Sequence, residues 1–146
     1  MKKTLPQYKL MLVREKELQY DHRLDSISDA IDLMIHMGLA DAPEEFVYVF
    51  CVDCRGSLIA IHEISHGTLT GALVSVRSIY SRALINNSSA IILGHNHPSG
   101  NPVPSGADIS ITRKIKSAGE LLEIPLLDHI IIGSSSTFSM KQNSLL

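Results

Sequence analysis

The most constraining feature of this sequence is a segment in which a short apolar stretch leads directly into two histidines, a turn rich in proline and glycine, and a helix start. Residues 90–94 have the length and composition of a buried strand. The polar segment 95–105 follows, and its prolines interrupt regular backbone hydrogen bonding. Ser105 can cap a helix, which is expected over residues 106–118 and is closed by Gly119. The chain is therefore expected to pass from strand to helix through one rigid turn.

The rest of the chain predicts further strands and helices of ordinary length. Runs of β-branched and aromatic residues predict strands, and apolar residues with helical spacing after a serine predict helices. Strands come first and then alternate with helices, which predicts an α/β (α+β) sandwich built on one mostly apolar mixed sheet flanked by helices. The expected elements are strands at 8–13, 46–52, 58–61 and 126–132, a helix from Ser26 or Ser28 to Gly38, and a helix from Ser75 to about residue 84.

Length and charge restrict the class of protein. A chain of 146 residues can bury its own core, so we expect residues 1–146 to form a single domain, with residues 1–24 as an N-terminal strand and lead-in. The formal net charge of −2 argues against a strong positive field over the whole domain. The sequence has neither a signal peptide nor an apolar run near the ~18 residues of a membrane span, so we expect a cytoplasmic protein without a membrane partner.

The two cysteines form a lone pair of the type CxxC, at Cys51 and Cys54. A zinc ribbon needs a second pair at suitable spacing. A redox pair opens a helix, whereas this one lies where a strand enters a turn. Because free cysteines are among the most buried residue types, we expect both to be structural.

The segment His62-Glu63-Ile64-Ser65-His66 matches the HExxH pattern of zinc proteases. That chemistry requires a helix, which brings both histidines to one face and the glutamate beside the metal. The preceding residues predict a strand instead, in which His62 and His66 share a face but lie about 13 Å apart. We therefore interpret this five-residue match as accidental.

His95 and His97 form a better-placed pair of candidate ligands. Because they are two residues apart at the end of an extended strand, their imidazoles point to the same side. Asp108 falls in the first turn of the next helix, from which its carboxylate can return to the two histidines. Two neutral nitrogens and one carboxylate leave a fourth position for water, which is the open geometry of a catalytic zinc site. We therefore expect one Zn²⁺ per chain.

Each half of this arrangement also has a structural explanation. Ser105 and Asp108 have the spacing of a capping box, for which helix initiation alone is a sufficient reason. His95 and His97 could be ordinary loop histidines. Both features occur together at the end of an apolar strand, and this combination favours the metal site.

At these residues the sequence resembles the JAB/MPN/JAMM metalloprotease fold, whose signature is an upstream glutamate, then H-x-H, seven residues and S-x-x-D. The resemblance is to the bacterial and phage RadC-like branch of that fold, through LGHNHPSG at 93–100, PSGAD at 104–108 and LDHIIIG at 127–133. It spans roughly residues 10–146 and implies a cytidine-deaminase-like JAB/MPN sandwich. Longer RadC-like proteins carry an N-terminal helix-hairpin-helix segment, and we expect a stand-alone domain without it.

The resemblance implies a role for each matching residue. His95, His97 and Asp108 are the expected zinc ligands. Ser105 is expected to hydrogen-bond the oxyanion of the tetrahedral intermediate. The family's glutamate precedes an apolar strand, which places it at Glu45, where it takes a proton from the metal-activated water and returns it to the leaving amine.

Four further residues near this pattern receive weaker expectations. Glu44 is the alternative to Glu45, and strand alternation allows only one of the two to reach the metal. Asn96 is expected to point away from its histidine neighbours and to hold the loop in place through hydrogen bonds. For Asp128 and His129 we expect structural hydrogen bonds.

The resemblance implies a zinc-dependent metallopeptidase or isopeptidase that cleaves an amide bond in a peptide or protein, which the sequence does not identify. The alternative is a non-enzymatic module in DNA repair, replication or mobile-element transactions, with a DNA-associated partner. Arg113, Lys114 and Lys116 give a small basic patch on the last helix, although such runs are more often solvated faces. A scaffold that holds zinc for stability alone fits the open fourth position less well. The sequence leaves the oligomeric state open.

Overall fold

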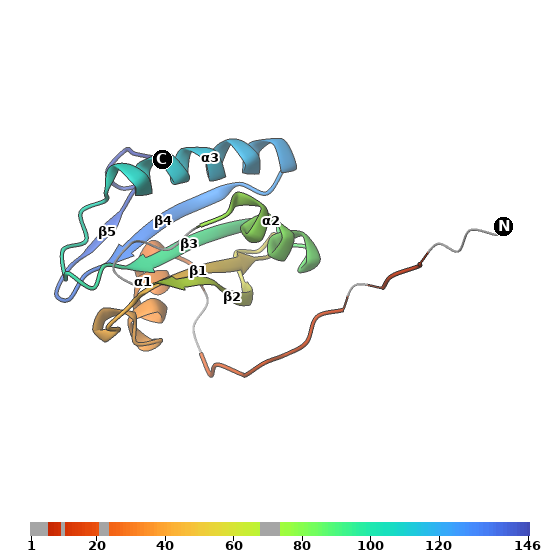
Figure 1. The fold of residues 1–146 in the computed structure, drawn as a ribbon, viewed down its shortest axis with the longest axis horizontal. Coiled ribbons are helices and arrows are strands. Elements are labelled where there is room, and N and C mark those ends of the chain that lie inside the picture. Colours follow the sequence, from red (N-terminus) through yellow and green to blue (C-terminus); the bar gives the residue numbers. More distant parts are fainter. Residues whose placement is uncertain (1–5, 10, 21–23, 68–73) are drawn as a thin grey trace.

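The computed structural model describes residues 6–9, 11–20, 24–67 and 74–146 (Figure 1). Its helices and strands follow the chain in the order α1, η1, β1, β2, α2, β3, α3, β4 and β5. Their bounds are α1 (Ile27–His36), the 3-10 turn η1 (Leu39–Asp41), β1 (Glu45–Val52), β2 (Leu58–Gly67), α2 (Val76–Ile85), β3 (Ala90–Asn96), α3 (Gly106–Leu122), β4 (Leu126–Ile132) and β5 (Thr137–Ser139).

Among the described residues the strands form one mixed sheet in the order β2-β1-β3-β4-β5. Strand β1 pairs antiparallel with both β2 and β3, and β4 pairs antiparallel with β5. Of the strand pairs in the described part of the chain, only β3 and β4 are parallel, and α3 makes the crossover between them. The carboxyl end of β3 and the start of α3 are therefore close together, and the carboxyl ends of parallel strands are the usual place for a ligand site in α/β sheets.

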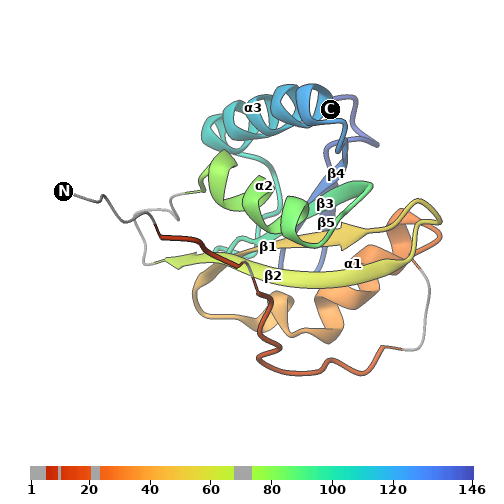
Figure 2. The ribbon, with the colours of Figure 1, turned by 90° about the vertical axis from the view of Figure 1, so that its right-hand side faces the viewer.

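The sheet is covered by helices on both faces (Figure 2), with α1 on one side and α2 and α3 on the other. Successive strand residues point to opposite faces, so Ile92 packs toward α1 whereas Ile91 and Leu93 pack toward α2 and α3. Every residue of β3 is buried, which explains the uninterrupted apolar run in the sequence. The expected α/β sandwich is confirmed.

Two element boundaries differ from the sequence prediction by more than two residues. Strand β2 runs on to Gly67 instead of ending at residue 61. Helix α3 passes through Gly119 and ends at Leu122, with Glu123 in the left-handed conformation as its cap. Gly119 is needed for close packing, because a side chain there would collide with the Tyr80 hydroxyl and the backbone of Ile124.

The expected strand at residues 8–13 is wrong for the part of it that the structure describes. Residues 6–9 and 11–20 form neither helix nor strand, and Tyr8 and Val13 are 85% and 87% exposed. A strand needs a neighbour for its backbone hydrogen bonds, and among the described residues no strand pairs with this segment. Leu10 and residues 1–5 lie outside the described residues.

The cysteine prediction holds for one of the two residues. Cys51 is buried in β1, where it joins the core under α2 and α3. Cys54 is exposed in the turn that follows β1. In the described part of the chain, none of the helices combines the length and the apolar character that a membrane crossing requires.

Candidate metal centre

The end of β3 and the first turn of α3 bring His95, His97 and Asp108 together. The His97 amide donates to the carbonyl of Ile132 over 2.9 Å, so the strand ladder continues past the end of β3 and both imidazoles point to the same side. The chain then turns at Gly100, whose φ of +82° is the left-handed region that glycine adopts without strain. The predicted convergence of the three side chains is confirmed.

The three candidate ligand groups lie close enough together to surround one ion, because one ligand atom from each can be chosen so that all three lie within 4.8 Å of one another. The two histidine Nε2 atoms are 3.0 Å apart, Asp108 Oδ1 lies 3.4 Å from His95 Nε2, and Asp108 Oδ2 lies 3.3 Å from His97 Nε2. Ligands of a tetrahedral ion with bonds of about 2.0–2.1 Å are separated by roughly 3.3 Å. The described residues form no other group of three such side chains, so this is their one candidate metal centre.

The protonation states of His95 and Asp108 suit a metal site. Burial lowers the pKa of His95 to about 4, against the opposing charge of Asp108, so this imidazole is neutral at neutral pH. Burial disfavours ionisation of Asp108, but hydrogen bonds from His97 and Ser105 outweigh it and hold its pKa below the usual range. Neutral imidazoles and an ionised carboxylate are the forms that bind a divalent cation.

Asp108 is also half of a capping box, as the alternative interpretation predicted. Its Oδ2 accepts from the backbone NH and the hydroxyl of Ser105, each over 2.7 Å. Its own amide donates to Ser105 Oγ over 3.1 Å. The cap and the site therefore share residues, because the hydrogen bonds that start α3 also aim the carboxylate at the histidines.

Asn96 fixes the backbone on both sides of Glu45. Its Oδ1 accepts from the amide of Phe46 over 2.8 Å, and its Nδ2 donates to the carbonyl of Glu44 over 2.9 Å. These bonds confirm that Asn96 points away from its histidine neighbours and ties a distant segment in place. They connect β3, which carries the histidines, to the first residue of β1.

Glu45 lies on the face of β1 that carries Val47, which pairs with His95 in the sheet. Its side chain lines a cavity together with His95 and Asp108. Partial burial and the charge of Asp108 raise the pKa of Glu45, and His97 opposes the shift. Glu44 is exposed. Glu45 is thus positioned near the candidate metal centre, and its role there stays a prediction.

Glu45 lines two cavities. The first, of about 190 Å³, reaches inward between the sheet and α3, and its floor is mostly apolar. The second, of about 410 Å³, lies on the His97 side. The first is lined by Glu45, Val47, Val74, Leu93, His95, Ala107, Asp108, Ile111 and His129. The second is lined by Pro43, Glu44, Glu45, Gly67, His97, Pro98 and Ser99.

The HExxH segment lies in β2 and not in a helix, and it forms no group of candidate metal ligands among the described residues. His62 Nε2 contacts Asn86 Nδ2 over 2.7 Å, on the side of α2. His66 Nδ1 contacts Glu63 Oε1 over 2.6 Å. The expectation that His62 and His66 share a face is wrong, because a register shift opposite residues 47 and 48 of β1 adds one residue to β2 and turns them to opposite faces.

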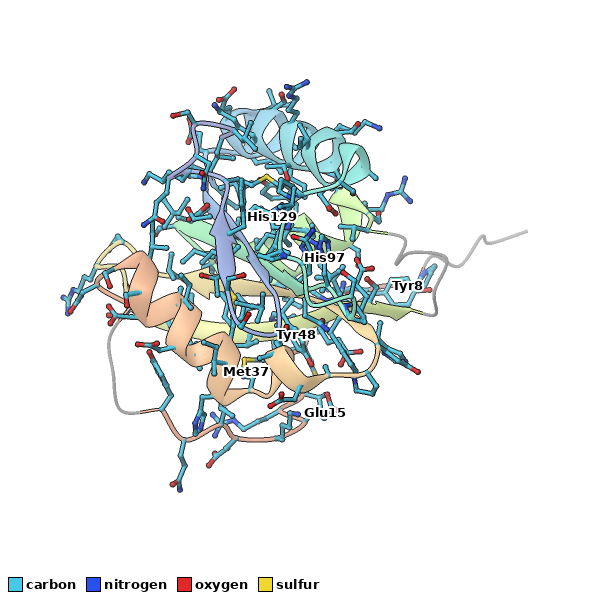
Figure 3. All side chains as sticks on the ribbon, turned by 90° about the vertical axis from the view of Figure 1, so that its left-hand side faces the viewer. Tyr8, Glu15, Met37, Tyr48, His97 and His129 are labelled. Carbon is cyan, nitrogen blue, oxygen red and sulfur yellow. The ribbon has the colours of Figure 1, made fainter. Side chains whose placement is uncertain are left out.

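The buried residues His129 and Thr112 extend the site away from solvent. Figure 3 labels His129 together with His97. His129 Nε2 lies 2.7 Å from His95 Nδ1, and His129 Nδ1 lies 2.6 Å from the hydroxyl of Thr112. Asp128 has the expected structural role, since it accepts from the amides of His129 and Lys141. Thr112 was not singled out from the sequence, although its position one helical turn after Asp108 was the available signal.

A family model described as "RadC-like JAB domain" matches residues 24–145. This chain belongs to the RadC-like JAB domain family. Its curated relatives include UPF0758 proteins of Alkaliphilus oremlandii (46% identical over 103 residues, 70% of this chain and 44% of the relative) and Alkaliphilus metalliredigens (40% over 125 residues, 86% and 53%). A third, from Pelodictyon phaeoclathratiforme, is 38% identical over 134 residues, 90% of this chain and 60% of the relative.

The RadC-like JAB chain spans about half the length of these relatives. The match confirms the family and is consistent with a metal group at His95, His97 and Asp108. The relatives' names state no activity. Activity and substrate are therefore questions for the chemistry of the site.

Proposed function

We propose that this RadC-like JAB domain holds one Zn²⁺ at His95, His97 and Asp108 and hydrolyses an amide bond in a peptide or protein. The observation that carries the proposal is the convergence of three typical zinc-ligand groups, whose nearest atoms are 3.0–3.4 Å apart, close to the roughly 3.3 Å between ligands of a tetrahedral zinc ion. Imidazole nitrogen and carboxylate oxygen are typical zinc ligands, and three protein ligands are typical of catalytic sites.

When bound, Zn²⁺ would lower the pKa of a water molecule to about 7 and polarise the substrate carbonyl. Glu45 is the group in this chain that accepts the proton of the attacking water and delivers it to the leaving amine. Its partly buried position raises its pKa toward neutrality, which suits a carboxylate that must both take and release a proton. Asn96 holds the peptide groups around Glu45 in place for this exchange.

Ser105 is the proposed donor to the oxyanion that develops on the carbonyl oxygen. Its single hydroxyl proton is donated to Asp108 Oδ2 in this structure. A hydroxyl proton serves one strong acceptor at a time, so Ser105 must exchange Asp108 for the substrate oxygen during the reaction. The backbone NH of Ser105 keeps its own bond to Asp108 and holds the carboxylate meanwhile.

The two cavities support an extended substrate that crosses the metal centre. Glu45 lines both of them, so a chain whose scissile amide lies at Glu45 would extend into one cavity on each side. The cavity lined by Val47, Leu93 and Ile111 suits an aliphatic side chain. A macromolecular substrate is thus favoured over a small polar amide.

The test can be made before the natural substrate is identified. Zinc-loaded protein and its Glu45→Gln variant are incubated with a peptide mixture of defined composition, and new amino termini are identified by mass spectrometry. We expect one zinc per chain in both proteins and new termini only with the unmodified chain. Zinc-free protein at equimolar metal, or termini that are equally abundant with Glu45→Gln, would contradict the proposal.

A further inference from the structure

Four groups behind the candidate metal centre form a continuous hydrogen-bonded chain. The Thr112 hydroxyl lies 2.6 Å from the carbonyl of Asp108 and 2.6 Å from Nδ1 of His129. The opposite ring nitrogen of His129, Nε2, lies 2.7 Å from Nδ1 of His95. Thr112, His129 and His95 are 1–2% exposed, so water does not compete for these bonds.

The chemistry of the groups determines the direction of every proton. A backbone carbonyl can only accept, so the Thr112 hydroxyl donates its one hydrogen to Asp108. The Thr112 oxygen then accepts from Nδ1–H of His129. A neutral imidazole that donates through Nδ1 accepts through Nε2, so His129 accepts from Nδ1–H of His95. His95 is left with an unprotonated Nε2, which is the atom that faces His97 and Asp108.

His97 reaches the same state by a separate route. Its Nδ1 lies 2.8 Å from the carbonyl oxygen of Asn101, which can only accept a hydrogen bond. When the His97 ring is neutral, its lone pair is therefore on Nε2, the nitrogen that lies 3.3 Å from Asp108 Oδ2 and would bind the metal ion. The tautomers of the two histidines are thus fixed by different hydrogen bonds. Nδ1 of His97 is bonded directly to a backbone carbonyl, whereas Nδ1 of His95 is bonded to another side chain.

We infer that His129 and Thr112 are positioning residues that hold His95 in the tautomer whose Nε2 is free to bind a metal ion. The inference rests on the proposed metal site and extends it to two residues that are not among the proposed metal ligands. Removal of the Thr112 hydroxyl lets His129 reverse its tautomer and donate to His95 Nδ1. His95 then carries its proton on Nε2, and metal binding requires that this proton be displaced.

The experiment compares three variants with the unmodified chain. Thr112→Val removes the hydroxyl at nearly constant volume, and Thr112→Ser restores it. Tyr80→Phe is the matched control, because the Tyr80 hydroxyl is also buried and also donates to a backbone carbonyl of α3, that of Ile115, over 2.8 Å. We expect Thr112→Val to weaken Zn²⁺ binding by about 10- to 100-fold in competition with a chromogenic chelator. Thr112→Ser and Tyr80→Phe should bind as the unmodified chain does.

A second readout does not involve metal. Long-range ¹H–¹⁵N spectra of the metal-free protein distinguish protonated from unprotonated ring nitrogens, with His95 assigned from a His95→Asn variant. We expect a protonated Nδ1 on His95 in the unmodified chain and in Thr112→Ser, and a mixture of tautomers in Thr112→Val. A protonated Nε2 on neutral His95 in the unmodified chain overturns the inference, and so does equal loss of zinc affinity in Thr112→Val and Tyr80→Phe. Absence of zinc binding in the unmodified chain would instead refute the proposed function.

Discussion

The chain contains an internal control for its metal centre, because α1 and α3 start with the same capping box. In α1 the carboxylate of Asp29 accepts from the amide and hydroxyl of Ser26 over 2.8 and 2.9 Å, as Asp108 accepts from Ser105. Asp29 and Asp108 therefore have the same local role, and only Asp108 belongs to a group of candidate metal ligands among the described residues. Asp29→Asn and Asp108→Asn separate helix capping from metal binding.

In the absence of metal, both variants keep one acceptor oxygen but lose the charge at the helix N-terminus. That charge is worth about 0.3–1 kcal/mol, or roughly 1–4 °C in Tm for a domain of this size. Zinc at 100 times its Kd stabilises the folded state by about 2.7 kcal/mol. At roughly 2–4 °C per kcal/mol, this raises Tm by about 5–11 °C.

The assay is thermal unfolding with and without Zn²⁺, followed by circular dichroism. We expect the rise of about 5–11 °C in the unmodified chain and in Asp29→Asn, and none in Asp108→Asn. A rise of equal size in all three proteins would show that zinc binds elsewhere. It would refute the reasoning that joins the capping box to the metal centre.

Four other predictions follow from single features. Ser105→Ala and Ser26→Ala should each remove about 1 kcal/mol of folding stability, because each serine caps a helix. Only Ser105→Ala should also lower turnover, by about 10²- to 10³-fold, and equal turnover in the two variants would contradict the oxyanion role. Gly119→Ala should destabilise by about 1–3 kcal/mol in urea unfolding, whereas Gly106→Ala, with nothing within 4 Å of its added carbon, should not. Burial raises the pKa of the Cys51 thiol, so a thiol reagent at pH 8 should label only the exposed Cys54 in the native protein, and labelling of both would contradict the described core. Replacing Arg113, Lys114 and Lys116 with glutamate should leave zinc-dependent cleavage unchanged. A salt-dependent affinity for a DNA duplex that survives His97→Ala would instead favour the DNA-associated alternative.

The parts of the fold that could be predicted from the sequence are those that local patterns specify. The apolar runs of β1 and β3 and the serines that cap α1, α2 and α3 are visible in short windows of sequence. The ligand set was predictable for the same reason, since two histidines at strand spacing and a carboxylate in a capping box are local features. Strand β5, with three residues, is too short for a periodic signal and exists because β4 offers it an edge.

The features that were missed depend on residues distant in the chain. The separate faces of His62 and His66 result from the extra residue in β2, which is defined only by its register with β1. Thr112 gains its role from His129, a residue of another element. Gly119 was predicted to end α3, but its small size serves the contact with Tyr80 on α2.

The amide side chain of Asn96 has a mechanical consequence for the reaction. It hydrogen-bonds to the two peptide groups that flank Glu45, and it belongs to the same strand as His95. This linkage opposes sliding of β1 against β3, which would separate the Glu45 carboxylate from the His95 imidazole. The spacing between base and ligand is thus held by a side-chain linkage as well as by the backbone pairing of the two strands, so an Asn96 substitution would loosen the first without breaking the second.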